Sequence, residues 1–339
     1  MVEAQQEKPL VTITGITGFL GVATALAFIE EGGFRIRGTV RSKTNAAKID
    51  PLKAALGAAF DDVELVEADL LDKESMKAAV AGSTYVAHTA SPFVMTVSKD
   101  NKDELIKPAV DGTLSVLEGA KEAGVKKVVV TSSMAAIQAV AAENKPADGV
   151  WNSSHWSDPD RPEGMNPYLE SKTLAERAAW KYVEDLPEGE KFDLITICPC
   201  FILGPTKNQD GFTSGGFIKG ALLGKTKPIA KSAMGIVDVR DVALAHVRAI
   251  TVPEAAGQRF ITWAGSFWRI DIQKILDEEF TSKGWPIVTE EGPETGDVQS
   301  KVDNSPSKDI LGIEYHSLKD TILGMANAMI ESGHVQKPE

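Results

Sequence analysis

Short apolar, β-branched runs alternate along the chain with longer stretches in which apolar residues recur at helical spacing. The runs predict strands at residues 10–14, 35–40, 63–67, 85–88, 127–131 and 192–198. The stretches between them predict helices at residues 19–31, 46–55, 75–81, 104–123 and 167–183. The run KVVVT at 127–131 is typical of a strand that is buried on both faces of a parallel sheet. This alternation predicts an α/β fold with a doubly wound parallel sheet, in which ligands bind at the carboxyl ends of the strands.

The pattern loosens in the last part of the chain, where glycine and phenylalanine cluster and shorter elements mix. Asp238 is the expected cap of one helix there, and a last amphipathic helix is expected at residues 317–332. We predict a main sheet domain and a smaller C-terminal lobe that is interleaved with it. The main domain would comprise residues 1–203 and 236–252, and the lobe residues 204–235 and 253–339.

The composition is that of an ordinary globular protein. Of the 339 residues 43% are hydrophobic and 25% are charged, which is close to the average for folded domains. The net charge is −12 and the isoelectric point is about 5.1. Because a nucleic-acid-binding protein needs a basic surface, this balance predicts no nucleic-acid partner.

Cysteine and histidine usage predicts neither a disulfide nor a metal site. Cys198 and Cys200 lie two residues apart on a predicted strand, so their side chains share one face in a poor geometry for a disulfide. The five histidines are scattered, without the spacing of metal ligands. The chain enters its first strand within about ten residues, and no apolar run approaches the roughly 20 residues of a membrane span. We expect a cytoplasmic protein with no membrane partner, either a monomer or a homodimer.

The first predicted strand ends in the glycine turn TGITGFLG. Gly15 allows the tight turn, Gly18 lets the backbone approach a pyrophosphate, and Gly21 permits close packing of helix on strand. The N-terminus of the following helix would then face the phosphates. The turn lies between the first strand and the first helix, so it predicts a dinucleotide-binding, Rossmann-type domain. The predicted contacts from the turn are Gly15, Thr17, Gly18, Phe19, Leu20 and Gly21.

The end of the second strand indicates which dinucleotide binds. An NAD site has an acidic residue there for the ribose hydroxyls, whereas a 2′-phosphate requires a cation. This chain has Arg41, followed by Lys43 and Lys48, and arginine matches a phosphate well. NADPH is therefore favoured over NADH. Asp69, after the third strand, is suited to accept a hydrogen bond from the adenine amino group; the alternative is that it caps the next helix.

Tyr168 and Lys172 form a Tyr-x-x-x-Lys pair on a predicted helix. A spacing of four places both side chains on one face, with Cβ atoms roughly 5–6 Å apart. An ammonium beside a phenol lowers the phenol's pKa from about 10, and a lowering by ~3 requires ~4 kcal/mol. Lysine and an oxidised nicotinamide together could supply that energy. Such a tyrosine can protonate a carbonyl oxygen while hydride reaches the carbon. The fifth strand ends in Ser132 and Ser133, one of which would hold the carbonyl, and spacing does not choose between them.

These residues together resemble the extended short-chain dehydrogenase/reductase family, in particular its dihydroflavonol reductase-like members and the yeast-type methylglyoxal (carbonyl) reductases. The motifs that carry the resemblance run in the family's order over about residues 11–246. They are TGITGFLG, RGTVRSKTNAAK, EADLLD, VAHTASPF, VVVTSSMAA, PYLESKTLAERAAWKY, ICPCFILGP and IVDVRDVALAH.

The resemblance implies a catalytic triad of Ser133, Tyr168 and Lys172, and its alignment on TSSMAA selects Ser133 over Ser132. Lys172 would also hold the nicotinamide ribose. The implied cofactor contacts outside the turn are Arg41, Lys48, Asp69, Leu70, Thr89, Ala90, Ser91, Tyr168, Lys172, Pro199, Ile202 and Ser214. The substrate would contact Tyr168 and a mostly apolar pocket of Phe93, Met95, Gln138, Phe201, Phe212 and Phe217, each of which could equally be a core residue.

The chain departs from the plant enzymes of this family. Flavonoid-reducing members have a glutamine where this chain has Gly235, and cinnamoyl-CoA reductases have a different sequence around the tyrosine than NPYLESK. The resemblance therefore implies neither plant substrate. It implies NADPH-dependent reduction of an aldehyde or ketone. The alternatives are an NAD-linked nucleotide-sugar epimerase or dehydratase, which Arg41 disfavours, and a non-catalytic NADP-sensing regulator, which typically lacks the tyrosine or the lysine.

Overall fold

The computed structural model describes residues 7–91, 102–160, 166–206, 214–225, 228–295 and 299–338. Its centre is a seven-stranded sheet in which every neighbouring pair is parallel, in the order β11-β7-β5-β4-β1-β2-β3. The predicted α/β fold with a doubly wound parallel sheet is confirmed. The strands are β1 (Leu10–Thr14), β2 (Arg35–Val40), β3 (Val63–Glu67), β4 (Tyr85–His88), β5 (Lys127–Thr131), β7 (Asp193–Pro199) and β11 (Arg259–Thr262).

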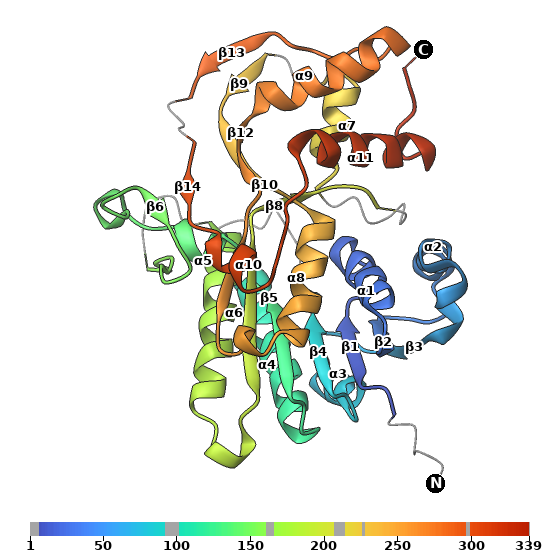
Figure 1. The fold of residues 1–339 in the computed structure, drawn as a ribbon, viewed down its shortest axis with the longest axis vertical. Helices are drawn as coiled ribbons and strands as arrows, with labels where there is room; N and C mark the ends of the chain where they lie inside the picture. The colour runs from blue at the N-terminus through green and yellow to red at the C-terminus, as the bar shows by residue number, and fades with distance from the viewer. Residues whose placement is uncertain are drawn as a thin grey trace.

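Both faces of this sheet are covered by helices, because the strands send alternate side chains to opposite sides. In β5, Val129 belongs to one hydrophobic core, whereas Val128 and Val130 belong to the other. One face carries α1 (Phe19–Glu31), α2 (Ala46–Leu56) and α8 (Val239–Thr251), and the other carries α3 (Lys73–Val80), α4 (Asp103–Glu122) and α6 (Pro167–Glu184) (Figure 1). The apolar run that suggested a doubly buried strand is therefore covered on both sides.

The smaller lobe lies beyond one end of the sheet (Figure 1). It contains a three-stranded sheet in the order β12-β10-β8 and the pair β13-β9. A further pair, β14-β6, joins residues 301–302 to residues 150–151. The strands and helices outside the large sheet and its six covering helices are β6 (Val150–Trp151), β8 (Phe201–Leu203), β9 (Ile229–Lys231), β10 (Ala233–Asp238), β12 (Gly265–Trp268), β13 (Glu291–Glu294), β14 (Lys301–Val302), α5 (Ala135–Gln138), α7 (Gly216–Leu222), α9 (Arg269–Phe280), α10 (Ser305–Asp309) and α11 (Leu318–Glu331).

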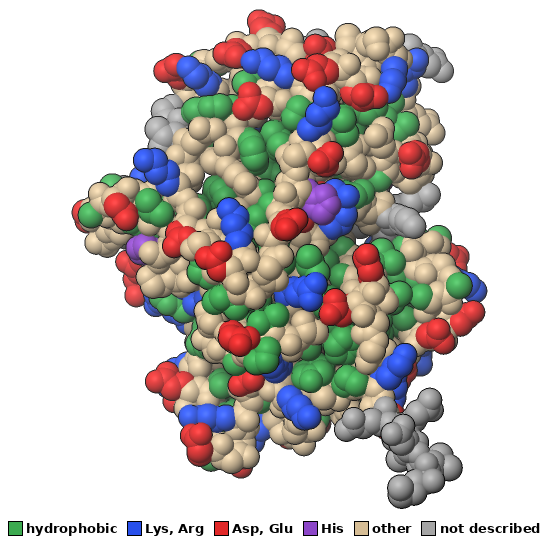
Figure 2. All heavy atoms as spheres, viewed as in Figure 1, with side chains coloured by type: hydrophobic (Ala, Val, Ile, Leu, Met, Phe, Trp, Pro, Cys, Tyr) green, Lys and Arg blue, Asp and Glu red, His purple; other side chains and the backbone are tan. Residues whose placement is uncertain are grey.

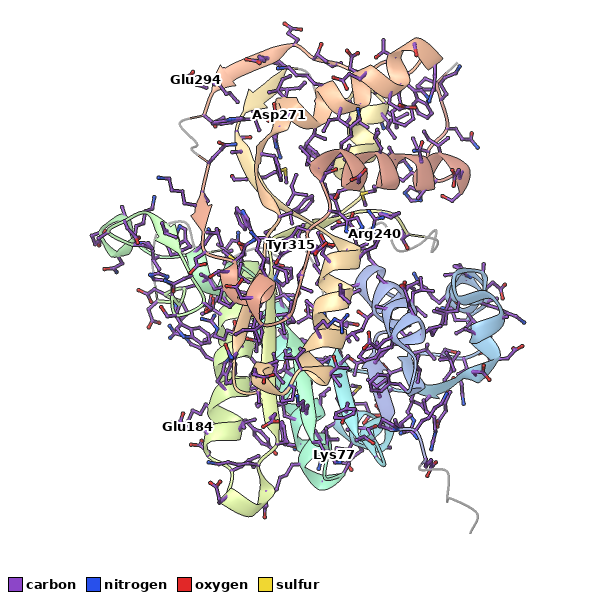
Figure 3. All side chains as sticks on the ribbon, in the orientation of Figure 1. Lys77, Glu184, Arg240, Asp271, Glu294 and Tyr315 are labelled. Atoms are coloured by element: carbon purple, nitrogen blue, oxygen red, sulfur yellow. The ribbon has the colours of Figure 1, made fainter. Side chains whose placement is uncertain are left out.

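The division of the chain is more interleaved than the sequence suggests. Helix α8 packs against α1 in the main domain. Strand β11 falls within the range 253–339 that we assigned to the lobe, but it pairs with β7 at the edge of the large sheet. Asp238 is the helix cap expected, since its side chain accepts a hydrogen bond from the Arg240 amide at 2.9 Å. Arg240 and Tyr315 mark the level at which lobe and sheet domain meet (Figure 3).

The surface view agrees with a composition in which 25% of the residues are charged. Acidic and basic side chains are interspersed over the face shown in Figure 2. Within the described part of the chain, no helix is long and apolar enough to cross a membrane. No group of three or more metal-binding side chains occurs among the same residues, and Cys198 and Cys200 are free thiols.

Candidate active site

The candidate site lies at the carboxyl ends of the central strands. Gly15 follows β1, Ser91 closely follows β4, and Ser133 follows β5. The strand order reverses between β1 and β4, because the chain builds β2 and β3 on one side and β5 onward on the other. Ligands of open α/β sheets bind at such a reversal. The fold thus places the glycine turn and the predicted catalytic residues at one edge of the sheet.

The glycine turn is shaped by close backbone approaches. Gly15 has φ of 69°, and a Cβ there would lie 3.0 Å from Ala90 Cα. A Cβ on Gly21 would lie 2.2 Å from the Gly15 carbonyl oxygen. Gly18 is the N-cap of α1 with no side-chain cap, and the first turn of α1 carries no acidic residue. Amide groups of an uncapped helix N-terminus suit a pyrophosphate, so this turn fits a dinucleotide. Phe19 and Leu20 bury their side chains, so only their backbone is available for the predicted contact.

The segment after β4 is hydrogen-bonded to the end of β1, at the point where the strand order reverses. The Thr89 hydroxyl donates to the Thr14 carbonyl oxygen at 2.7 Å, and the Ala90 amide donates to Thr14 Oγ1 at 3.1 Å. Thr14 Oγ1 also bonds His88 Nδ1 at 2.7 Å. Burial lowers the pKa of His88 to about 3, so its ring is neutral. The predicted contacts Thr89, Ala90 and Ser91 therefore belong to a segment that is fixed against the glycine turn.

The residues expected near the adenosine half of the cofactor follow β2 and β3. Arg41 is exposed directly after β2, and Lys48 lies in α2. Asp69 Oδ1 accepts a hydrogen bond from the Leu71 amide at 2.9 Å. The N-cap of α3 is Asp72, so the alternative of Asp69 as a helix cap is wrong.

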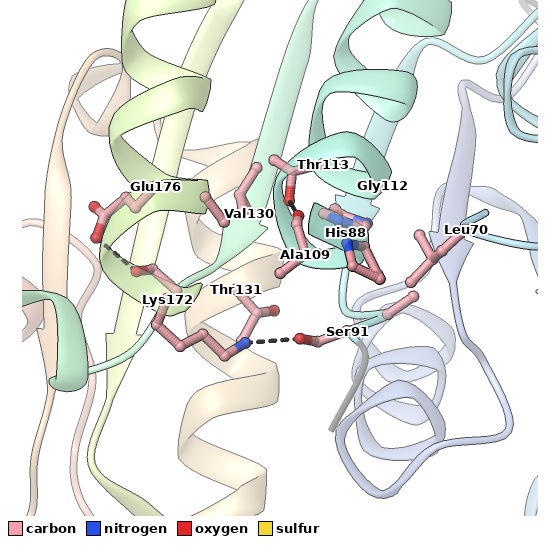
Figure 4. Close-up of a pocket in the computed structure, with 14 residues that line it drawn as sticks. Leu70, His88, Ser91, Ala109, Gly112, Thr113, Val130, Thr131, Lys172 and Glu176 are labelled. Atoms are coloured by element: carbon pink, nitrogen blue, oxygen red, sulfur yellow. Dashed lines mark hydrogen bonds between the residues drawn. The ribbon is translucent and has the colours of Figure 1, made fainter. Parts of the chain in front are cut away.

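Asn166 starts helix α6 and thereby places Tyr168. The Asn166 side chain accepts a hydrogen bond from the Leu169 amide at 3.0 Å, and Pro167 occupies the first turn, where its missing N–H costs nothing. Tyr168 and Lys172 then lie one turn apart, with Lys172 Nζ 6.0 Å from the centre of the Tyr168 ring. Lys172 Nζ donates to Ser91 Oγ at 2.9 Å (Figure 4). The Tyr-x-x-x-Lys pair therefore reaches across to the loop after β4.

Burial is the largest influence on the pKa values of Tyr168 and Lys172. Burial raises the pKa of Tyr168 above 10.0, and a hydrogen bond with Ser133 opposes this rise. For the protein alone the net direction is upward, because the buried phenolate would lose its hydration. The lowering expected from Lys172 together with an oxidised nicotinamide stays a prediction. Burial also lowers the pKa of Lys172 to about 8, against the charge of Glu176. At neutral pH Tyr168 keeps its proton and Lys172 remains mainly an ammonium.

The two adjacent serines have different partners. Ser133 bonds Tyr168, and its Oγ accepts from the Ala135 amide at 3.1 Å. Ser132 is buried, and its Oγ donates to Glu176 Oε2 at 2.5 Å. The geometry thus brings Ser133, and not Ser132, to the phenol, in agreement with the residue that the family resemblance selects.

The remaining predicted contacts are spread over the lobe side of the site. The Pro199 carbonyl accepts from the Met134 amide at 2.9 Å, and the Ile202 carbonyl accepts from Ser214 Oγ. Gln138 ends α5, and its Nε2 is buried without a hydrogen-bond partner among the described residues. Phe201 and Phe217 are half-buried at this side, and Leu70 is half-buried after β3. Phe93, Met95 and Phe212 lie outside the described residues.

Behind Lys172 lies a cavity of about 20 Å³ between α4 and α6 (Figure 4). Its lining includes Lys172, Glu176, Ser132 and His88. That volume is enough for roughly one water molecule, so it is not the carbonyl substrate pocket. Sequence reasoning missed Glu176, although its position four residues after Lys172 places it on the same helix face.

Comparisons with known proteins identify the family. Residues 11–261 match the model of the NAD dependent epimerase/dehydratase family. The chain belongs to this family. It is 33% identical over 330 residues to cinnamoyl-CoA reductase 1 of Petunia hybrida, covering 97% of this chain and 94% of the relative. The family is NAD dependent by its description, so the cofactor class of this chain is an NAD(P) dinucleotide.

Solved structures give the same grouping. The yeast methylglyoxal/isovaleraldehyde reductase Gre2, complexed with NADPH, superposes with a TM-score of 0.81 at 28% identity, covering 96% of this chain and all (100%) of that one. Vestitone reductase from alfalfa superposes with a TM-score of 0.78 at 26% identity, covering 97% and 100%. The resemblance to extended short-chain dehydrogenases/reductases of the dihydroflavonol reductase-like group is confirmed, and the chain is an oxidoreductase of this group.

Proposed function

We propose that this protein reduces an aldehyde or a ketone to the alcohol with NADPH. The observation that carries the proposal is the contact between Ser133 and Tyr168, with Lys172 one helical turn away, at the strand ends next to the glycine turn. A phenol and a hydroxyl that converge on one point can both hydrogen-bond a carbonyl oxygen, and the phenol can then protonate it.

Each residue of the triad has a distinct role. Tyr168 is the general acid, since its raised pKa keeps the proton on the phenol until negative charge develops on the substrate oxygen. Ser133 fixes that oxygen by donating its hydroxyl hydrogen. Lys172 places a positive charge beside the phenol, which stabilises the phenolate left after proton transfer. NADPH, when bound, supplies the hydride that reduces the carbonyl carbon.

The chain's own residues also fit the cofactor. The uncapped N-terminus of α1 receives the pyrophosphate, Asp69 retains a carboxylate oxygen for the adenine amino group, and Lys172 holds the nicotinamide ribose. Arg41 and Lys48 bind the 2′-phosphate, which makes NADPH the preferred coenzyme. The substrate enters from the smaller C-terminal lobe. We assign to this lobe residues 204–235 and 253–339, without strand β11.

The relatives support this reading. Gre2 is a reductase of methylglyoxal and isovaleraldehyde, and its structure contains NADPH. Methylglyoxal and isovaleraldehyde both carry an aldehyde group, so the shared chemistry is carbonyl reduction. The other relatives are named as reductases of cinnamoyl-CoA and of vestitone. We therefore propose a small-molecule substrate that carries a carbonyl group.

The test is a substrate panel run in parallel with NADPH and NADH. α-Dicarbonyls, aryl aldehydes and dihydroflavonols are each offered to the purified protein, and coenzyme oxidation is followed by absorbance. We expect turnover of at least one class and a higher kcat/KM with NADPH than with NADH. Oxidation of NADPH by none of the classes would overturn the proposed function, and a preference for NADH would overturn the role of Arg41.

A further inference from the structure

We propose that Glu176 and Ser132 are positioning residues for the reaction, because the Glu176 carboxylate holds Ser132 and thereby fixes the neighbouring Ser133 against Tyr168. The inference rests on the proposed function of the Ser-Tyr-Lys site. Neither residue is proposed to touch the reacting carbonyl. Their role is to set the distance between the two groups that do.

Glu176 is a buried carboxylate with partners on several elements. It is 1% exposed. Its Oε2 accepts from Ser132 Oγ at 2.5 Å, and its Oε1 accepts from Thr196 Oγ1 at 2.8 Å. Arg259 adds two bonds, Nε to Oε1 at 2.7 Å and Nη2 to Oε2 at 3.1 Å. A two-pronged arginine–carboxylate pair has a fixed orientation, so the direction in which Oε2 faces Ser132 is fixed as well.

Arg259 is itself held from the other side. Its side chain is 9% exposed, and Nη1 donates to the carbonyl oxygens of Ser153 at 2.6 Å and His155 at 2.7 Å. The guanidinium carbon lies 3.6 Å from the centre of the Trp156 ring, in the stacked arrangement that arginine favours. The Glu176 carboxylate, which holds Ser132, therefore has little freedom to rotate or to shift.

Helix α6 carries both Glu176 and the catalytic pair. Tyr168, Lys172 and Glu176 follow one another at intervals of four and share one face. Figure 4 shows Lys172 and Glu176 on this face, opposite the end of β5. Two consecutive serines are thus held by one rigid helix, Ser133 by Tyr168 and Ser132 by Glu176. The Ser132 amide donates to the Ile197 carbonyl at 2.7 Å. This bond to β7 restrains the backbone of Ser132 as well.

If Ser132 and Glu176 only stabilised the fold, the loss of the Ser132 hydroxyl would have a different expected effect. Thr196 bonds the same carboxylate from β7 but is not next to a catalytic residue in the sequence. Removing either hydroxyl deletes one neutral donor to Glu176, so both changes affect stability by a similar mechanism. Only the loss of the Ser132 hydroxyl would also remove a side-chain restraint on the residue next to Ser133, which the Ser132 amide bond to β7 would then hold alone. Thr196 is therefore the matched control.

The experiment compares Ser132→Ala with Thr196→Val in the full-length protein. Thermal unfolding, NADPH affinity and the kinetics of the best carbonyl of the panel are measured for each. We expect Ser132→Ala to lower kcat by about 10- to 100-fold, since a displacement of ~1 Å at a reacting group costs on the order of 10²-fold. We expect its NADPH affinity to be unchanged, and Thr196→Val to keep kcat within about twofold.

A second comparison asks whether Ser132 acts through Ser133. Residues that work as a unit are non-additive, so Ser132→Ala should cause no further loss of kcat in a Ser133→Ala background. Equal kcat values for Ser132→Ala and Thr196→Val, or a further loss in that background, would overturn the positioning role. An inactive wild-type protein would instead overturn the proposed function, so the two failures are distinguishable.

Discussion

Replacing Gly21 with alanine tests the cofactor turn through a clash whose size the structure defines. A Cβ at this position would lie 2.2 Å from the Gly15 carbonyl oxygen and 2.9 Å from Ile16 Cα. Both are backbone atoms, so no flexible side chain can move aside. An ordinary contact requires a separation above about 3 Å, and the start of α1 must therefore shift by ~1 Å relative to the turn.

The shift should act on the cofactor more than on the fold. Alanine is the better helix former by about 1 kcal/mol, which offsets part of the strain. The pyrophosphate, however, is bound by the turn and the first turn of α1 together, and we expect the Gly21→Ala variant to bind NADPH at least about tenfold more weakly. The assay is fluorescence titration with NADPH, combined with thermal unfolding to show that the variant is folded.

Gly216→Ala is the matched control, because a Cβ on Gly216 meets no atom of the described residues within 4 Å and the residue starts α7 in the lobe. It should keep NADPH affinity within about twofold, since no backbone contact is disturbed. If Gly21→Ala binds NADPH as tightly as the wild-type protein, the reasoning from the close approach of α1 to the turn is refuted.

Three further predictions concern charge. Arg41→Glu should raise the KM for NADPH about 10- to 100-fold and leave that for NADH nearly unchanged, because a charge-assisted hydrogen bond is worth about 1.5–3 kcal/mol; equal changes for both coenzymes would contradict it. Burial lowers the pKa of His88 to about 3 and of His246 to about 4. Unfolded histidines bind protons near 6.5, so the urea-unfolding free energy should decrease from pH 7 to pH 5, and less so in His246→Gln. Glu176→Gln leaves the Arg259 charge buried and should cost about 3–5 kcal/mol in urea unfolding; a cost below ~1 kcal/mol would disprove the buried pair.

The sheet was predictable because strand and helix periodicities are local properties of the sequence. Its apolar strands are short, continuous and separated by helices, and the ends of β1 and β5 carry recognisable glycine and serine motifs. The lobe was less predictable, since its strands are short and its pairings join distant segments. Strand β11, with the sequence RFIT, carries no local signal that separates an edge strand of the large sheet from a strand of the lobe.

The site shows the same division between local and distant information. The spacing of Tyr168 and Lys172 on one helix face follows from sequence alone. The raised pKa of Tyr168 depends on burial by the surrounding fold, which spacing does not report. The pairing of Glu176 with Arg259 joins residues 83 positions apart, so no local pattern could reveal it. The different partners of Ser132 and Ser133 likewise appear only once α6 is packed against the end of β5.

The most direct test of the central claim is the turnover of Tyr168→Phe with NADPH and the best carbonyl of the panel. Phenylalanine keeps the ring and removes only the hydroxyl that Ser133 contacts. If Tyr168 is the general acid, kcat should fall by about 10²- to 10⁴-fold, while NADPH affinity and the unfolding temperature stay close to those of the wild-type protein. A variant that folds, binds NADPH and retains most of its kcat would contradict the account.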